Sequence, residues 1–205
     1  CCWSEFIIFQ NMAITYATWN PSDKHADVTL TGWNLIATSL QTTWRNARAT
    51  IWVSSWKWYW EYKVTGWAIE TMSAIGTSSA TLWGSWSTYP GSDTFSYWYY
   101  GNWGNKFNNA SSSAYGSGYT TNDVIGVALD MNAWTLIFYK NNASQWTAYT
   151  WLSGTFFPII GLNANGQQVT ANFWATTMTY TAPAGYNQWL YTWTANNSSP
   201  FLAFM

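Results

Sequence analysis

The feature that most constrains the fold is a series of apolar runs and short turns between residues 122 and 150. Val124 to Leu129 is an uninterrupted run of apolar residues and glycine, and Thr135 to Tyr139 is rich in β-branched and aromatic residues. Residues 131–134 separate these two runs, Asn141-Asn142 makes a second turn, and a third run begins at residue 143. Short runs joined by short turns predict consecutive hairpins, so this region should form an antiparallel meander.

Strand patterns recur about every ten residues along the remaining chain. In residues 57–64, alternation places Trp58, Trp60, Tyr62 and Val64 on one face, and Lys57, Tyr59, Glu61 and Lys63 on the other. We expect Glu61 to pair with these lysines on an outer face. No apolar stripe at helical spacing continues over three turns, so the chain is predicted to be all-β. Further strands are expected at 15–18, 28–31, 35–38, 47–53, 72–77, 96–100, 156–162 and 169–173, with a turn at 20–24.

The length of 205 residues suits one large β domain. We divide the chain into an N-terminal segment (1–13) that could belong to a preceding domain, a β domain (14–187), and a C-terminal tail or linker (188–205). The largest apolar residues of the expected strands should form the buried core: Trp60, Ile125, Val127, Leu129, Leu136, Phe138, Phe157, Ile159 and Phe173.

Composition excludes several functions. Charged residues make up 7% of the chain and the net charge is −1, with no basic stripe, so nucleic acid is not an expected partner. No apolar run approaches the ~20 residues of a membrane-spanning helix, so no membrane insertion is expected. Cys1 and Cys2 are the only cysteines and give no ligand set for a metal. No metal or cofactor is predicted.

Residues for catalysis are also sparse. Glycoside hydrolysis needs two carboxylates at a set separation, but no strand places two of them on one face. His25 is the only histidine and lies in an expected loop, and no Gly-x-Ser-x-Gly motif supplies a nucleophile. The sequence therefore favours a protein that is not an enzyme.

Several motifs, taken in order, carry a family resemblance. They are the 54–61 segment (Ser-Ser-Trp-Lys-Trp-Tyr-Trp-Glu), Ile75-Gly76, Tyr115-Gly116, the 123–141 hairpin, Phe156-Phe157-Pro158 and the 169–173 segment (Val-Thr-Ala-Asn-Phe). Together they resemble the SPRY (B30.2) domain over roughly residues 16–187. The resemblance implies a bent, concanavalin-like β-sandwich (jelly roll) of two antiparallel sheets that binds a protein or peptide ligand through loops at one rim.

The amino-acid sequences of residues 19–24 and 181–186 are similar to those of SPRY-like domains in bacteriophage and prophage structural proteins. That similarity implies a virion-associated or cell-surface location and assembly into a larger virion or surface structure. A carbohydrate-binding, lectin-like module on a tail or surface protein is the alternative function, because aromatic rings and amides also suit glycans. A purely structural domain that contacts only neighbouring subunits is a third.

Loop aromatics are the candidate ligand-binding residues. The stretch from 79 to 121 is rich in Gly, Ser, Tyr and Asn, a composition typical of binding loops. Alternation along 97–100 also indicates that part of this aromatic set packs in the core. The candidates are Tyr89, Trp98, Tyr100, Asn102, Trp103, Tyr115 and Tyr119.

The chain contains 19 tryptophans, several of which stand where the family resemblance implies glycine. At Trp134, a turn residue before a strand, we expect the backbone to need a positive φ, which glycine adopts freely and tryptophan does not. UGA codons are read as glycine or as tryptophan in different bacterial codes, so we hypothesise that some of these tryptophans are UGA codons. The positions concerned are Trp56, Trp134, Trp146, Trp151 and Trp174, together with Trp98 and Trp103.

Overall fold

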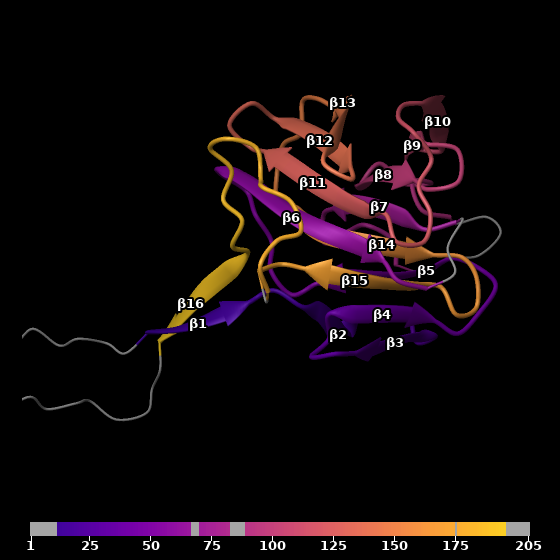
Figure 1. Cartoon of the computed structure of the whole chain (residues 1–205), viewed down its shortest axis with the longest axis horizontal. Coiled ribbons are helices and arrows are strands. Elements are labelled where there is room, and N and C mark those ends of the chain that lie inside the picture. Colours follow the sequence, from indigo (N-terminus) through magenta and orange to yellow (C-terminus); the bar gives the residue numbers. More distant parts are fainter. Residues whose placement is uncertain (1–11, 67–69, 83–88, 175, 196–205) are drawn as a thin grey trace, which may run out of the picture.

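The computed structural model describes residues 12–66, 70–82, 89–174 and 176–195. These residues form strands, turns and loops, with no helix among them. Two seven-stranded antiparallel sheets pack face to face, and a separate two-stranded ribbon projects from the sandwich (Figure 1). The all-β sandwich predicted from the sequence is confirmed.

The first sheet, called the β7 sheet, has the strand order β10-β9-β8-β7-β14-β5-β2. Its strands are β10 (Ser111–Ala114), β9 (Asn105–Asn108), β8 (Ser96–Tyr100), β7 (Met72–Gly76), β14 (Phe157–Leu162), β5 (Arg45–Ala49) and β2 (Trp19–Lys24). The β6 sheet has the order β13-β12-β11-β6-β15-β4-β3. Its strands are β13 (Ala143–Tyr149), β12 (Thr135–Lys140), β11 (Val124–Asp130), β6 (Lys57–Val64), β15 (Gln168–Asn172), β4 (Ile36–Ser39) and β3 (Val28–Thr31). The ribbon pairs β1 (Met12–Tyr16) with β16 (Tyr191–Ala195).

Several segments differ from the sequence prediction. Strands β9 and β10 lie in the stretch expected to form binding loops. The expected turn at 20–24 belongs to β2, an edge strand that pairs only with β5 and does so with a shift in register. Pro21 is tolerated there because an edge strand leaves one row of N–H groups unpaired. Residues 191–195 of the expected tail form β16, whose pairing with β1 depends on residues far away in the sequence.

The core lies between the two sheets and is dominated by aromatic side chains. Trp19 stacks on Tyr62 with ring centroids 5.6 Å apart, and the edge of Phe173 closes on both rings. Eight of the nine predicted core residues are buried. The prediction for Phe157 is wrong, because its neighbour Phe156 takes the core position. Phe157 is half-buried, and the guanidinium of Arg48 lies 5.5 Å from the centroid of the Phe157 ring.

The outer face of β6 is covered as well. Tyr59, Ala128 and Ala182 form a small buried cluster there, with Tyr139 and Tyr186 packed against it. Glu61 is buried in this layer and accepts hydrogen bonds from the backbone N–H groups of Thr179 and Tyr180, at 2.7 and 2.8 Å. The expected pairing of Glu61 with lysines is therefore wrong, since this carboxylate holds the segment after β15 against the sheet.

Candidate functional site

The seven sequence-predicted binding residues do not form one surface. Trp98, Tyr100 and Tyr119 are buried, so their side chains are not available to a ligand at the surface. Both faces of β8 are covered: Trp98 and Tyr100 pack on the outer side with Met72 and Ile159, and the opposite side faces the main core. Ligand contact by these three side chains stays a prediction, which their burial does not favour.

Two tyrosines order the loops around residues 101–103 and 115–119, which lie side by side at the end of the sandwich that we call the rim. The Tyr119 hydroxyl receives the N–H of Ser73 at 3.0 Å and lies 2.9 Å from the carbonyl oxygen of Tyr99, to which it can donate. Tyr115 is half-buried; its hydroxyl donates to the carbonyl oxygen of Trp146 at 2.7 Å. Tyr115 and Tyr119 therefore hold loops in place.

The other predicted residues reach the surface to different degrees. Trp103 is exposed and rests edge-on against Tyr100, with ring centroids 5.7 Å apart. Asn102 beside it and Tyr89 are half-buried. Of the predicted set, Trp103 and Asn102 thus remain as neighbouring residues that a ligand can reach, and ligand contact by them stays a prediction.

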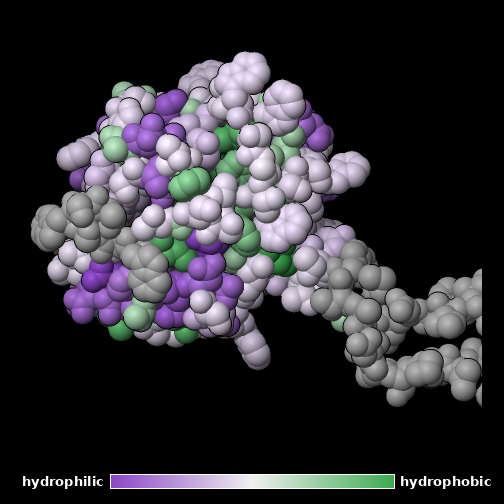
Figure 2. Space-filling view, turned by 180° about the vertical axis from the view of Figure 1, so that it is seen from behind, coloured by the Kyte–Doolittle hydropathy of each residue, from purple (hydrophilic) through white to green (hydrophobic). Residues whose placement is uncertain are grey.

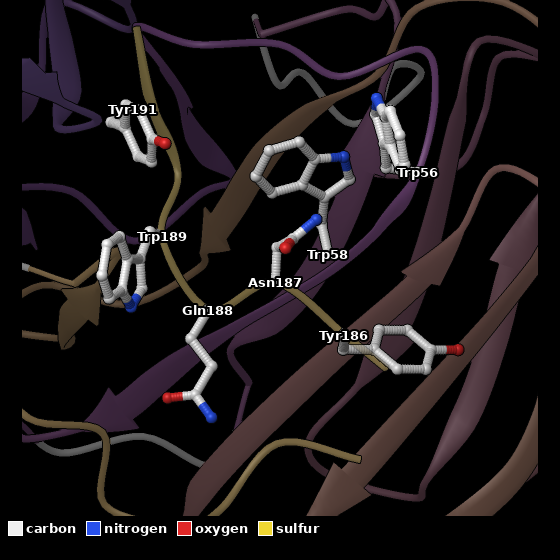
Figure 3. Close-up of a pocket in the computed structure, with 7 residues that line it drawn as sticks. All are labelled: Trp56, Trp58, Tyr186, Asn187, Gln188, Trp189 and Tyr191. Carbon is white, nitrogen blue, oxygen red and sulfur yellow. The ribbon is translucent and has the colours of Figure 1, made fainter. Parts of the chain in front are cut away.

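A second surface has the shape of a binding site. It is an open groove of about 720 Å³ at the beginning of β6, which we call the aromatic groove (Figure 3). Aromatic rings and two side-chain amides line it, and the amides of Asn187 and Gln188 lie between the rings in Figure 3. The lining residues are Trp56, Trp58, Tyr186, Asn187, Gln188, Trp189 and Tyr191.

Backbone pairing builds the groove. The 186–191 segment runs beside the first residues of β6, where the backbone N–H of Asn187 donates to the carbonyl oxygen of Lys57 and the N–H of Tyr59 donates to that of Asn187, each at 2.8 Å. This short parallel bridge begins where β15 ends, since β15 pairs with β6 only from Glu61 onward. The groove therefore rests on the first residues of β6, a strand in the middle of its sheet.

The groove is nearly neutral. At its edge the Lys57 ammonium forms an ion pair with Asp130, with Nζ 2.9 Å from Oδ2, and lies 5.7 Å from the centroid of the Tyr186 ring. Burial, with the nearby Asp130 carboxylate, raises the pKa of Tyr186 to about 12, so its hydroxyl stays protonated and can donate a hydrogen bond at neutral pH. Rings, amides and a hydroxyl suit a ligand with apolar groups and hydrogen-bonding groups such as a peptide backbone.

The rim and the groove lie at opposite ends of β6. The N–H of Asn122, just after Tyr119, donates to the carbonyl oxygen of Val64 at the end of β6, whereas Trp58 stands at its beginning. Figure 2 shows the side of the molecule opposite to that in Figure 1, where pale and green side chains gather toward the right and hydrophilic ones at the lower left. Ligand contact by the two surfaces can therefore be tested separately.

The sequence did not predict the aromatic groove, because the pattern of residues 186–191 indicates a loop and C-terminal tail. The signal that could have found it is the sequence Tyr186-Asn187-Gln188-Trp189, which combines aromatic rings with amides after a glycine turn. Within the described part of the chain, no cluster of three or more His, Cys, Asp or Glu could hold a metal. The same residues include no helix long and apolar enough to cross a membrane.

Sequence comparisons identify relatives of the chain. The family model described as "SPRY domain" matches residues 57–176, which is more than half of the chain. Ran-binding protein 9 of Xenopus tropicalis is 34% identical over 116 residues, covering 56% of this chain and 21% of the relative. Human Ran-binding protein 9 is 33% identical over 116 residues, covering 56% of this chain and 16% of the relative. The chain thus spans about a fifth of the length of such relatives.

Structural comparisons show the same fold. The SPRY domain of human HERC1 superposes with a TM-score of 0.67 at 17% identity, covering 78% of this chain and 99% of that structure. The PSpry domain of TRIM65 has a TM-score of 0.63 at 13% identity and covers 77% of this chain and 89% of that one. At these identities the likeness concerns the fold alone.

Proposed function

Because the chain belongs to the SPRY domain family, we propose that it is a non-enzymatic module that binds a protein or peptide ligand through the aromatic groove. The observation that carries this proposal is the groove itself, an open, nearly neutral hollow with aromatic walls, two amides and the beginning of β6 as its floor. Aromatic side chains give large contact area at low cost in conformational entropy, and neighbouring amides satisfy backbone groups of a ligand.

The ligand is an uncharged, extended peptide segment with at least one apolar side chain. An open groove accepts an extended chain, and its apolar rings favour an apolar anchor. The Lys57 charge is already neutralised by Asp130, so charge contributes little to recognition. We expect affinity to change less than tenfold between about 50 and 300 mM salt, because screening acts mainly on unpaired exposed charges.

Selection of peptides on the immobilised chain, followed by calorimetry on the best binder, tests this proposal. Trp189→Ala, which removes a ring from the groove, should weaken binding at least tenfold. Trp103→Ala is the matched control, because it removes an exposed tryptophan from the rim at the other end of β6. Loss of binding in Trp103→Ala, with binding kept in Trp189→Ala, would move the site to the rim and refute the groove.

The relatives' names bear on the biological setting. The relatives named above are animal proteins called Ran-binding proteins, and each contains a long additional sequence outside the matched region. They give no support to the virion or phage setting expected from the sequence, and we do not propose it. Glycan binding also lacks support from these comparisons; saturable glycan binding lost in Trp189→Ala would replace the peptide with a sugar as the ligand of the same groove.

A further inference from the structure

Six tryptophans have a backbone conformation that suits glycine. Their φ angles lie in the left-handed region, where the Cβ of an L-residue crowds the backbone and bulky side chains are outliers. The other non-glycine residues with positive φ in the described part of the chain are five asparagines and one alanine, and asparagine is common in this region. The tryptophans are Trp33 (60°), Trp56 (69°), Trp134 (57°), Trp146 (67°), Trp151 (61°) and Trp174 (91°).

The side chains of these residues pack little against the protein, so packing does not offset the backbone strain. Trp33 is 91% exposed, Trp151 82% and Trp146 80%. Trp56 and Trp134 are also exposed, and Trp174 is half-buried against the ring of Trp189. Trp134 and Trp151 lie near each other, with ring centroids 6.4 Å apart. Strained backbone persists where surrounding contacts impose it, and these mostly exposed rings supply few such contacts.

The backbone at these positions explains why φ is positive. Trp146 lies in a bulge of β13: Ile137 pairs with Thr147 and Tyr139 with Ser144, so two residues oppose Phe138. Such bulges commonly place a glycine in the left-handed conformation. Trp134 ends the tight turn before β12, in which the Asp130 carboxylate accepts the N–H groups of the two residues after Met131.

Other tryptophans of the chain behave differently. Trp19, Trp60 and Trp98 are fully buried, and none of them has a positive φ. The chain therefore contains tryptophans that pack as expected beside a group that occupies strained surface positions. Both groups belong to the 19 tryptophans of the 205-residue chain. A positive φ adds Trp33 to the positions suspected from the sequence, and neither Trp98 nor Trp103 has one.

We propose that the six tryptophans with positive φ correspond to UGA codons that the source cell reads as glycine, so that the natural protein carries glycine at these positions. UGA differs from the glycine codon GGA in one base, and bacterial codes differ in reading UGA as tryptophan or glycine. Five of the six side chains stand on the surface, so glycine there leaves the core intact. In the aromatic groove, glycine at position 56 removes one wall and glycine at position 174 removes the ring stacked on Trp189, while Trp58, Tyr186 and Trp189 remain.

This inference is tested by sequencing the six codons and by mass spectrometry of one tryptic peptide of the natural protein. The peptide between Lys106 and Lys140 contains Trp134 as its single tryptophan, so its mass reports that position alone. The peptide from Trp58 to Lys63, with Trp58 and Trp60, is the internal control and should carry both tryptophans. We expect UGA at the six codons and glycine at position 134; UGG codons, or tryptophan at position 134, would overturn the proposal.

A stability measurement on the purified protein tests the conformational basis. Two synthetic genes, one encoding tryptophan and the other glycine at the six positions, provide the pair. Relief of left-handed strain should raise the Tm of the glycine form by about 2 °C or more for each position. Trp60→Gly is the control and should lower the Tm, because Trp60 is buried. A glycine form with an equal or lower Tm would refute the inference.

Discussion

Replacing Glu61 by glutamine removes one charged acceptor from beneath the segment that leads to the aromatic groove. The Glu61 carboxylate receives the N–H groups of Thr179 and Tyr180 at 2.7 and 2.8 Å, one on each oxygen, and the hydroxyl of Tyr59 at 3.2 Å. Glutamine has the same shape but keeps only one acceptor oxygen. One backbone N–H must then face the amide NH₂ group and lose its partner.

The expected cost is about 2 kcal/mol. A hydrogen bond to a charged group contributes roughly 1.5–3 kcal/mol, and a buried donor left without a partner costs roughly 1–3 kcal/mol. For a chain of this size, that loss corresponds to a Tm lower by roughly 4–8 °C. Urea unfolding followed by tryptophan fluorescence gives the free energy of unfolding directly.

Lys63→Gln is the matched control because Lys63 lies two residues further along β6, on the same face, and is exposed. Its neutralisation should change the free energy of unfolding by less than about 0.5 kcal/mol, as for most surface substitutions. If Glu61 acted through an ion pair with this lysine, both variants would lose similar stability. A Glu61→Gln variant as stable as the parent chain would refute the buried-anchor argument.

Three further predictions concern the core, the close approach of the Gly126 backbone to Tyr59, and the dependence of stability on pH. Phe173→Ala should cost about 3–5 kcal/mol in urea unfolding, because its fully buried ring fills the space beside Trp19; a loss below about 1 kcal/mol would contradict this packing. Gly126→Ala should destabilise by about 1–3 kcal/mol, since a Cβ there would stand 2.4 Å from the Tyr59 hydroxyl oxygen; adding Tyr59→Phe should recover part of the loss. Burial alone would raise the pKa of Asp130, but hydrogen bonds from Lys57 and two backbone N–H groups outweigh it and lower that pKa. The stabilisation from Asp130 is therefore present above its usual pKa of 3.8 and is lost as pH falls through the lower folded value. Asp130→Asn should show a smaller loss of stability than the parent chain between about pH 5 and pH 2, and equal losses would contradict the assignment.

The sandwich could be predicted because local patterns determine it. The β11–β12 hairpin follows from apolar runs and a short turn, and β6 follows from the alternation of its residues between two faces. Burial on both faces of a strand is less predictable from alternation. In β8, Trp98 and Tyr99 point to opposite faces, yet both are buried because each face is covered by another part of the chain.

The candidate site could not be predicted from local sequence. The groove exists because residues 186–191 pair with the first residues of β6, a contact between distant segments that no periodicity reveals. Glu61 shows the same limit: alternation places it correctly on the outer face, but the layer that covers this face comes from residues after β15. Residue types indicated an aromatic binding surface, and tertiary contacts decided which aromatics reach it.

An NMR titration of the chain with a peptide selected on it, observing the indole N–H signals, tests whether the aromatic groove is the binding site. Trp58 and Trp189 line the aromatic groove, and Trp103 lies at the far rim. The account predicts saturable shifts of the Trp58 and Trp189 signals with an unchanged Trp103 signal. A Trp103 signal that shifts while Trp58 and Trp189 stay in place would contradict it.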